Sequence, residues 1–221
     1  MEEAWWNTPA YAALANAEIS DALDALGLPG SALGLSGVTG EHRIFGPAYT
    51  VRFAPIDDAK PGTVGDFIDD VAPGQVIALD NGGRTDCTVW GGILSQIAQA
   101  KGIAGTVING VCRDSQEAVN CGYAIFSRGV FMRTGKDRVQ VEAIGESISL
   151  GDVRVNAGDL ISGDRDGVVV IPAARAREVL DRAIKIHEAE KAIVEQTKAG
   201  KTLAEARRQL AYHTLQRHQS A

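Results

Sequence analysis

Two short apolar runs with a helical pattern between them constrain the fold of this chain more than any other feature. Val76-Ile77-Ala78-Leu79-Asp80 and Thr106-Val107-Ile108-Asn109 are typical of strands buried on both faces. Residues 89–99 follow a helical period, and the segment from Gly102 to Gly105 ends it. Consecutive parallel strands are joined by a right-handed crossover. The sequence therefore predicts an α/β fold built around a strand, helix, strand unit.

The rest of the chain is predicted to extend this unit at both ends. Apolar residues at helical spacing predict an opening helix over residues 8–26, stopped by Gly27 and Pro29, and a strand follows over residues 48–53. After Asp114 the pattern is one of short strands and turns, which indicates a second sheet or an extension of the first. These strands are expected over residues 124–126, 138–141, 153–155 and 167–172.

The last 49 residues have a different character from the rest of the chain. Residues 173–210 form a long, charge-rich helical pattern that is interrupted at Gly200. We expect one domain over residues 1–221, because 221 residues with 45% hydrophobic side chains can bury one substantial core. Within it, residues 173–221 are expected to form a C-terminal helical extension that packs on a neighbouring subunit.

Charge and composition argue against two classes of partner. A net charge of −6 opposes binding to nucleic acid, which depends on cations that neutralise phosphates. The first residues carry acids where a secretory signal carries bases, and no apolar stretch approaches the roughly 18 residues of a membrane helix. We therefore expect a cytoplasmic protein with neither nucleic acid nor membrane as a partner.

The three cysteines are most simply interpreted as reduced thiols. Cys87, Cys112 and Cys121 are odd in number, and their spacing matches no paired zinc pattern. Cys112 precedes Arg113 and could be a nucleophile, but the sequence indicates no histidine beside it. A structural thiol is the favoured interpretation.

Arg113 and Asp114 lie just past the predicted strand that ends at Asn109, separated from it by Gly110, Val111 and Cys112. Ligand sites of α/β sheets form just beyond the carboxyl ends of the strands, so a cation and a carboxylate there are candidates for chemistry. The alternative is an ordinary surface ion pair, or a helix N-cap in which Asp114 accepts a backbone N–H.

A second candidate is the start of the helix that follows Trp90. Small residues at Gly91 and Gly92 leave the backbone N–H groups of this turn, including those of Ile93 and Leu94, open to an anion such as a carboxylate. The alternative is that the two glycines serve tight packing or a turn.

Taken together, several spaced motifs resemble the RraA-like family over roughly residues 8–208. This family includes the class II 4-hydroxy-4-methyl-2-oxoglutarate and 4-carboxy-4-hydroxy-2-oxoadipate aldolases and the regulator of ribonuclease activity. The motifs are Ile19-Ser20-Asp21-Ala22-Leu23, Gly46-Pro47-Ala48-Tyr49-Thr50-Val51-Arg52, Trp90-Gly91-Gly92, Asn109-Gly110-Val111-Cys112-Arg113-Asp114 and the segment from Gly163 to Pro172.

The resemblance implies an α/β/β/α sandwich with a swivelling β/β/α element. It also implies a homotrimer or a hexamer of paired trimers, with sites between neighbouring subunits. At each site Asp114 would hold a divalent ion, Mg²⁺ or Mn²⁺, and Arg113 would contact the keto-acid oxygen. Backbone N–H groups from Gly91 to Leu94 would bind the substrate carboxylate.

The same resemblance implies that a glutamate of the C-terminal helix reaches the neighbouring subunit's site. The candidates are Glu188 and Glu190, of which Glu190 is favoured. The alternative for either is a solvated carboxylate in a charged helix, where such residues are common.

The implied reaction is a metal-dependent cleavage of a 4-hydroxy-2-keto acid to pyruvate. Bond breaking leaves the enolate of pyruvate, which a metal ion and a guanidinium stabilise only once cleavage has begun. Oxaloacetate decarboxylation passes through the same enolate, so we expect that side activity as well.

Two positions depart from the family pattern and leave other functions open. Many members carry an acid at the position of Gly92, and an Asp in place of Asn109. One alternative is therefore a lyase or hydrolase acting on a different hydroxy or keto acid. Another is a non-catalytic regulator that binds a ribonuclease or helicase, although the regulator branch loses the carboxylate that Asp114 retains here.

Overall fold

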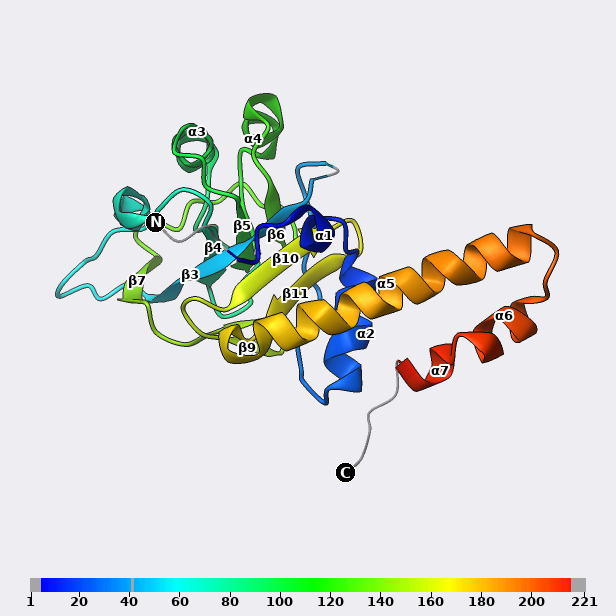
Figure 1. Cartoon of the computed structure of the whole chain (residues 1–221). Coiled ribbons are helices and arrows are strands. Elements are labelled where there is room, and N and C mark those ends of the chain that lie inside the picture. Colours follow the sequence, from blue (N-terminus) through cyan, green and yellow to red (C-terminus); the bar gives the residue numbers. More distant parts are fainter. Residues whose placement is uncertain (1–4, 41, 216–221) are drawn as a thin grey trace. The chain divides into compact units, whose positions relative to one another are not determined.

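The computed structural model describes residues 5–40 and 42–215 of the chain (Figure 1). They fall into two compact units: the larger comprises the described residues of 31–173, and the smaller comprises those of 1–30 and 174–221. Part of the predicted C-terminal extension, residues 216–221, lies outside the described residues. One domain over residues 1–221, and the packing of 173–221 on a neighbouring subunit, stay predictions.

The larger unit contains eleven strands and three helical segments among its described residues. The strands are β1 (Ser31–Ala32), β2 (Ser36–Gly37), β3 (Ile44–Pro55), β4 (Val76–Asp80), β5 (Gly105–Asn109), β6 (Ile125–Ser127), β7 (Val139–Ile144), β8 (Ile148–Leu150), β9 (Val153–Val155), β10 (Leu160–Asp164) and β11 (Gly167–Ile171). The helical segments are the 3-10 helix η1 (Asp66–Asp70) and the α-helices α3 (Gly92–Ala100) and α4 (Ser115–Cys121). A short 3-10 helix, η2 (Ala173–Arg175), follows β11.

The predicted parallel core is confirmed. Strands β3, β4, β5 and β6 pair in parallel, with Ala48 opposite Val76 and Val76 opposite Gly105. The first part of β3 also pairs antiparallel with β10, which continues to β11. The strands predicted over residues 124–126, 138–141 and 167–172 therefore belong to the main sheet, whereas the one predicted over 153–155 is β9, which forms a separate two-stranded sheet with β8.

Strand β4 shows why its sequence is a continuous apolar run. Ile77 and Leu79 belong to a core that includes residues of the helical layer, while Val76 and Ala78 belong to a second core formed with β8 to β11. Since both faces of a strand are covered in such an arrangement, alternation with polar residues is not needed. Figure 1 shows α3 and α4 on the same face of the sheet. The fold is thus mixed α/β, as predicted.

The structure corrects the sequence interpretation just after Asp114. Residues expected to be strand and turn there form helix α4, which ends at Gly122 with a φ of 73°. A glycine in the left-handed region is a common helix terminator, so the end of α4 has an ordinary cause. This helix matters because it carries one wall of the candidate site.

The smaller unit is helical. Its elements are α1 (Pro9–Ala12), α2 (Asn16–Ala25), α5 (Ala176–Lys198), α6 (Leu203–Gln209) and α7 (Tyr212–Leu215). The single opening helix predicted over residues 8–26 is wrong, because the Glu18 carboxylate accepts a 2.7 Å hydrogen bond from Ala15 N–H and begins a new helix there. The predicted break at Gly200 is confirmed, with a φ of 101°.

Helices α2 and α5 hold this unit together. Ile19 and Leu23 of α2 are buried, as are Val179 and Ile186 of α5, and the two helices are in contact. Polar bonds add to the packing: His187 Nδ1 lies 2.8 Å from Glu18 Oε1. Within the described residues, no helix is both long and apolar enough to cross a membrane.

Candidate functional site

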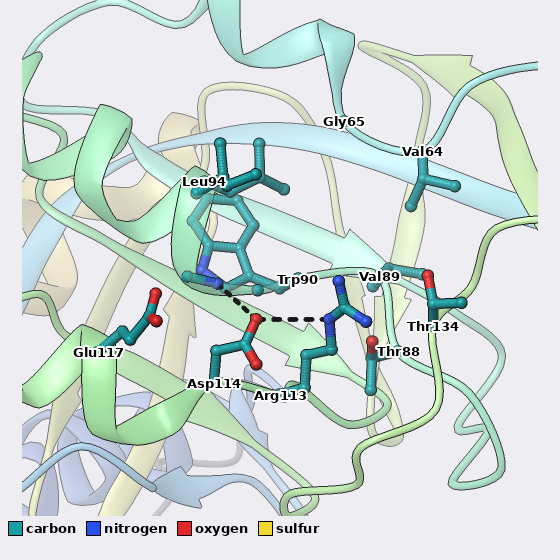
Figure 2. Close-up of a pocket in the computed structure, with 13 residues that line it drawn as sticks. Val64, Gly65, Thr88, Val89, Trp90, Leu94, Arg113, Asp114, Glu117 and Thr134 are labelled. Carbon is teal, nitrogen blue, oxygen red and sulfur yellow. Dashed lines mark hydrogen bonds and ion pairs between the residues drawn. The ribbon is translucent and has the colours of Figure 1, made fainter.

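Two loops of the larger unit come together to form a pocket. One precedes α3 and the other precedes α4, and Thr88 forms a parallel β-bridge with Val111 between them. The N–H of Arg113 donates a 3.0 Å hydrogen bond to the carbonyl of Trp90, which aligns the two loops further. The pocket has a volume of about 440 Å³ and is lined by Gly91, Gly92, Arg113, Asp114, Glu117 and others (Figure 2).

Trp90 is a buried residue that supports the turn at the start of α3. Its side chain is only 2% exposed and stacks on Tyr123, with ring centroids 5.9 Å apart and an interplanar angle of 15°. The indole N–H donates to Ser95 Oγ at 3.0 Å, and that hydroxyl donates to the carbonyl of Gly91 at 3.2 Å. A buried indole whose N–H is satisfied holds its neighbours in place, so Trp90 positions the turn that begins α3.

Asp114 adopts an unusual backbone conformation that aims its side chain away from its own helix. Its φ of 54° and ψ of 36° lie in the left-handed region, which Asp tolerates better than most residues. Its carbonyl accepts hydrogen bonds from Glu117 and Ala118, but its carboxylate does not cap α4. Instead Oδ2 accepts the N–H of Gly92 at 3.0 Å.

The side chains of Arg113 and Asp114 form an ion pair at the pocket. Arg113 Nε lies 3.4 Å from Asp114 Oδ2, and both side chains are about two-fifths exposed. An ion pair with this exposure contributes little to stability, because water screens it. Both side chains line the same pocket, so a ligand there would meet a guanidinium and a carboxylate together.

Gly91 and Gly92, at the start of α3, are closely approached by side chains of Arg113, Asp114 and Glu117. A Cβ on Gly91 would lie 2.9 Å from Asp114 Oδ2 and 3.2 Å from Arg113 Nε. A Cβ on Gly92 would overlap the Glu117 carboxylate. The tight-packing interpretation of these glycines therefore holds, and what packs against them is the candidate chemistry itself.

The start of α3 also offers free backbone donors. Of the four N–H groups predicted to bind a carboxylate, that of Gly92 is engaged by Asp114. Among the described residues no backbone carbonyl accepts from Ile93 or Leu94 outside the helix's own bonds. The first N–H groups of a helix have no intrahelical acceptor and carry its positive dipole end, so these two suit an anion.

Glu117 was missed in the sequence interpretation although it lines the pocket. It stands three residues after Asp114, in the first turn of α4. A detectable signal was present, because an Asp followed three residues later by Glu is a common start of a helix. The short apolar runs downstream predicted strands instead.

Glu188 and Glu190 belong to α5 of the smaller unit, and neither is among the residues that line the pocket. Glu190 Oε1 accepts a 2.6 Å hydrogen bond from the Tyr212 hydroxyl, and Glu188 is exposed. Their predicted role at a neighbouring subunit's site, and the predicted trimer or hexamer, stay predictions.

Asn109, one of the two unusual positions, serves the ends of the strands. Its amide donates to Asp80 Oδ1 at 2.9 Å, and its carbonyl oxygen accepts from Arg128 Nε at 2.8 Å. Asp80 Oδ1 also accepts the N–H of Gly82 at 2.9 Å. Asn109 thus links the loops that follow β4, β5 and β6 and is not part of the pocket wall.

Cys112 is buried, and its environment disfavours the thiolate. Burial raises the pKa of this thiol from 9.0 to about 11, and the Ser127 hydroxyl beside it offsets the effect only in part. Because the thiolate is the nucleophilic form, a thiol with this pKa is almost entirely unreactive near neutral pH. The structural interpretation of Cys112 is supported.

The donor set of the pocket fits a hard divalent cation that keeps most of its water. Asp114 Oδ1 has no hydrogen-bond partner among the described residues and is therefore available to a cation. Among the residues that the structure describes, no group of three or more His, Cys, Asp or Glu side chains could hold a metal ion. Mg²⁺ and Mn²⁺ are often bound by one or two carboxylates with water and substrate completing the shell, whereas zinc demands more protein ligands.

Comparison with known sequences relates the chain to two named proteins. Protein DlpA of Legionella pneumophila subsp. pneumophila is 39% identical over 201 residues, which are 89% of this chain and 32% of that protein. This chain therefore spans about a third of the length of DlpA. A Halalkalibacterium halodurans protein, provisionally named 4-hydroxy-4-methyl-2-oxoglutarate aldolase, is 36% identical over 169 residues, 76% of this chain and 77% of its own.

Solved structures agree with this relationship. An uncharacterized protein from Pseudomonas syringae pv. tomato matches with a TM-score of 0.86 and 40% identity, over 90% of this chain and 92% of that one. Streptomyces coelicolor RraAS2, described as an unusual member of the RNase ES inhibitor RraA protein family, matches with a TM-score of 0.74 and 26% identity, over 82% and 92%. The model of the RraA-like family, described as Aldolase/RraA, matches residues 16–170. The chain therefore belongs to the RraA-like family.

Proposed function

We propose that this protein is a divalent-metal-dependent lyase that cleaves a 4-hydroxy-2-keto acid, of the 4-hydroxy-4-methyl-2-oxoglutarate type, to pyruvate. The observation that carries the proposal is the meeting of Asp114, Arg113 and the free N–H groups of α3 in one pocket. The aldolase name of the Halalkalibacterium halodurans relative supports the same reaction class.

Each of these groups has a distinct task toward a 2-keto acid. The N–H groups of Ile93 and Leu94 bind the substrate carboxylate at the positive end of the nine-residue helix α3. The Arg113 guanidinium donates to the 2-keto oxygen, where negative charge develops as the carbon–carbon bond breaks. Asp114 would hold Mg²⁺ or Mn²⁺, and the bound ion would supply Lewis-acid stabilisation of that charge.

Oxaloacetate should be a second substrate. Loss of carbon dioxide from oxaloacetate leaves the same pyruvate enolate, and the groups that stabilise this charge do not depend on which bond was cleaved. We expect both activities, with unequal rates.

The test is pyruvate release from 4-hydroxy-4-methyl-2-oxoglutarate and from oxaloacetate, coupled to lactate dehydrogenase. Each substrate is assayed with Mg²⁺, with Mn²⁺ and with EDTA, and Asp114→Ala is the inactive control. Turnover that requires metal and disappears in Asp114→Ala supports the proposal. If the wild-type protein releases no pyruvate from either substrate, the proposal fails.

The second candidate is a regulator that binds a ribonuclease or helicase. It is favoured by the likeness to RraAS2, described as belonging to a family of RNase ES inhibitors, and by the net charge of −6, which suits a basic partner surface. Binding to such an enzyme that is unaffected by Asp114→Ala, in a protein without turnover, would favour this candidate over the lyase.

A further inference from the structure

The Glu117 carboxylate is the uncommitted acid of the pocket. It extends from the first turn of α4 and lies against Gly92 at the start of α3. Within residues 5–40 and 42–215, no side chain or backbone group forms a hydrogen bond or ion pair with this carboxylate. Figure 2 shows it on the same wall as Asp114 and Arg113.

The other titratable groups that line the pocket are less suited to accept a proton. The Arg113 guanidinium has only hydrogen-bond donors and no acceptor. Asp114 Oδ2 already accepts the N–H of Gly92 and lies 3.4 Å from Arg113 Nε, so this carboxylate is already engaged. Arg113, Asp114 and Glu117 are the ionisable side chains of the described lining, so Glu117 is the base candidate that this pocket itself supplies.

A retro-aldol cleavage needs such a base, whereas decarboxylation does not. The 4-hydroxyl must lose its proton as the bond between C3 and C4 breaks. Oxaloacetate has no 4-hydroxyl, and its cleavage requires only that the enolate charge be stabilised. The two proposed substrates therefore separate the role of a base from the roles of Arg113 and Asp114.

We propose that Glu117 is the catalytic base that removes the proton of the substrate 4-hydroxyl, a role that rests on the lyase function proposed above. The proton moves to the Glu117 carboxylate, and the O–H electron pair forms the new C4 carbonyl. The electrons of the C3–C4 bond remain on the pyruvate fragment as its enolate. The enolate takes a proton from water at C3, and the proton released by Glu117 neutralises the hydroxide.

Glu117 can occupy this position because residue 92 is a glycine. An ideal Cβ on residue 92 would lie 2.9 Å from Glu117 Cδ and 3.3 Å from Asp114 Cβ, in the space that the Glu117 carboxylate now fills. A side chain at position 92 and the present position of Glu117 therefore exclude each other. A carboxylate on residue 92 would enter nearly the same space from α3.

The first test is Glu117→Gln, which preserves shape and removes the base. We expect kcat for cleavage of 4-hydroxy-4-methyl-2-oxoglutarate to fall about 100-fold, the lower end of the usual contribution of a general base. Oxaloacetate decarboxylation and the Kd for Mn²⁺, measured by electron paramagnetic resonance without substrate, should change less than about twofold, because the variant keeps Arg113 and Asp114. The matched control is Glu142→Gln, an exposed glutamate on β7 outside the pocket lining.

The second test moves the carboxylate from α4 to α3. Glu117→Ala alone should lose cleavage. Adding Gly92→Asp should raise the cleavage rate at least about tenfold above that of Glu117→Ala, because one tenfold step is a small part of a general base's contribution. Circular dichroism melting confirms that each variant is folded.

Three results would overturn the assignment. A wild-type kcat for cleavage in Glu117→Gln shows that Glu117 is not the base. An equal loss of both reactions, together with weaker Mn²⁺ binding, shows that Glu117 supports the metal or the fold instead. A wild-type protein inactive on both substrates removes the lyase function and this role with it, a result distinct from an active wild type with an unaffected variant.

Discussion

Replacing Gly91 by alanine should reduce turnover without unfolding the protein. The backbone of Gly91 is extended, with φ −152° and ψ −171°, so alanine is accepted there without backbone strain. What the new methyl group meets is Asp114 Oδ2 at 2.9 Å and Arg113 Nε at 3.2 Å. The substitution is thus a small steric displacement of the two side chains proposed to act on the substrate.

The size of the effect follows from these distances. Ordinary contact of a Cβ begins near 3.4 Å, so the Asp114 carboxylate must move by about 0.5 Å. A misplacement of about 1 Å in an active site costs roughly 100-fold in rate, so half of it should cost about tenfold, or about 1.4 kcal/mol on the barrier. Stability should be unchanged or slightly higher, because alanine lowers the entropy of the unfolded chain.

The assay is kcat/KM for pyruvate release, compared with the thermal midpoint of the same preparation. Gly37→Ala is the matched control, because its Cβ would lie 3.4 Å from the Gly40 carbonyl oxygen, an ordinary contact outside the pocket. If Gly91→Ala kept both wild-type kcat/KM and wild-type Mn²⁺ affinity, the argument that Gly91 constrains the carboxylate would be refuted.

Three further predictions concern the groups around the pocket. Asp114→Asn should lower kcat/KM at least about 100-fold and weaken Mn²⁺ binding, because it removes the charged oxygen while keeping the Gly92 hydrogen bond possible; unchanged Mn²⁺ titrations would contradict the metal assignment. Trp90→Ala should cost about 3–5 kcal/mol in urea unfolding, since it empties the space of a fully buried ring stacked on Tyr123. Burial holds the pKa of Cys112 at about 11, above its ordinary 9.0, so the protonated thiol stabilises the fold fully below pH 9 and this contribution is lost as the pH rises toward 11. Cys112→Ala should therefore flatten the decline in unfolding free energy between pH 9 and 11 by ~2–3 kcal/mol, and equal slopes in the two proteins would refute this.

Much of the fold was predictable because its determinants are local. The apolar runs at β4 and β5 reflect strands buried on both faces, and the helical period between them reflects a helix buried on one face. Short-range sequence patterns report both directly. The break at Gly200 was likewise predictable from one residue type. The start of α2 was not, because a single side chain, Glu18, decides it by accepting the Ala15 N–H.

The candidate site was predictable only in part for the same reason. Arg113 and Asp114 could be identified because they follow the end of a strand, and Gly91 and Gly92 because they stand at the start of a helix. Glu117 lies on a helix that the pattern after Asp114 did not indicate. Its importance depends on the space beside Gly92, which no local pattern reports.

By itself the sequence determined the parallel strand, helix, strand unit and the place of Arg113-Asp114 at its carboxyl edge, because hydrophobic periodicity and chain order are properties of neighbouring residues. Only the tertiary structure decided where those side chains point. The bond from the Gly92 N–H to Asp114 joins residues 22 positions apart, and the Glu117 carboxylate fills a space that exists only because residue 92 has no side chain. Such contacts form when two loops are packed together, and the physics that sets them is steric exclusion between α3 and α4.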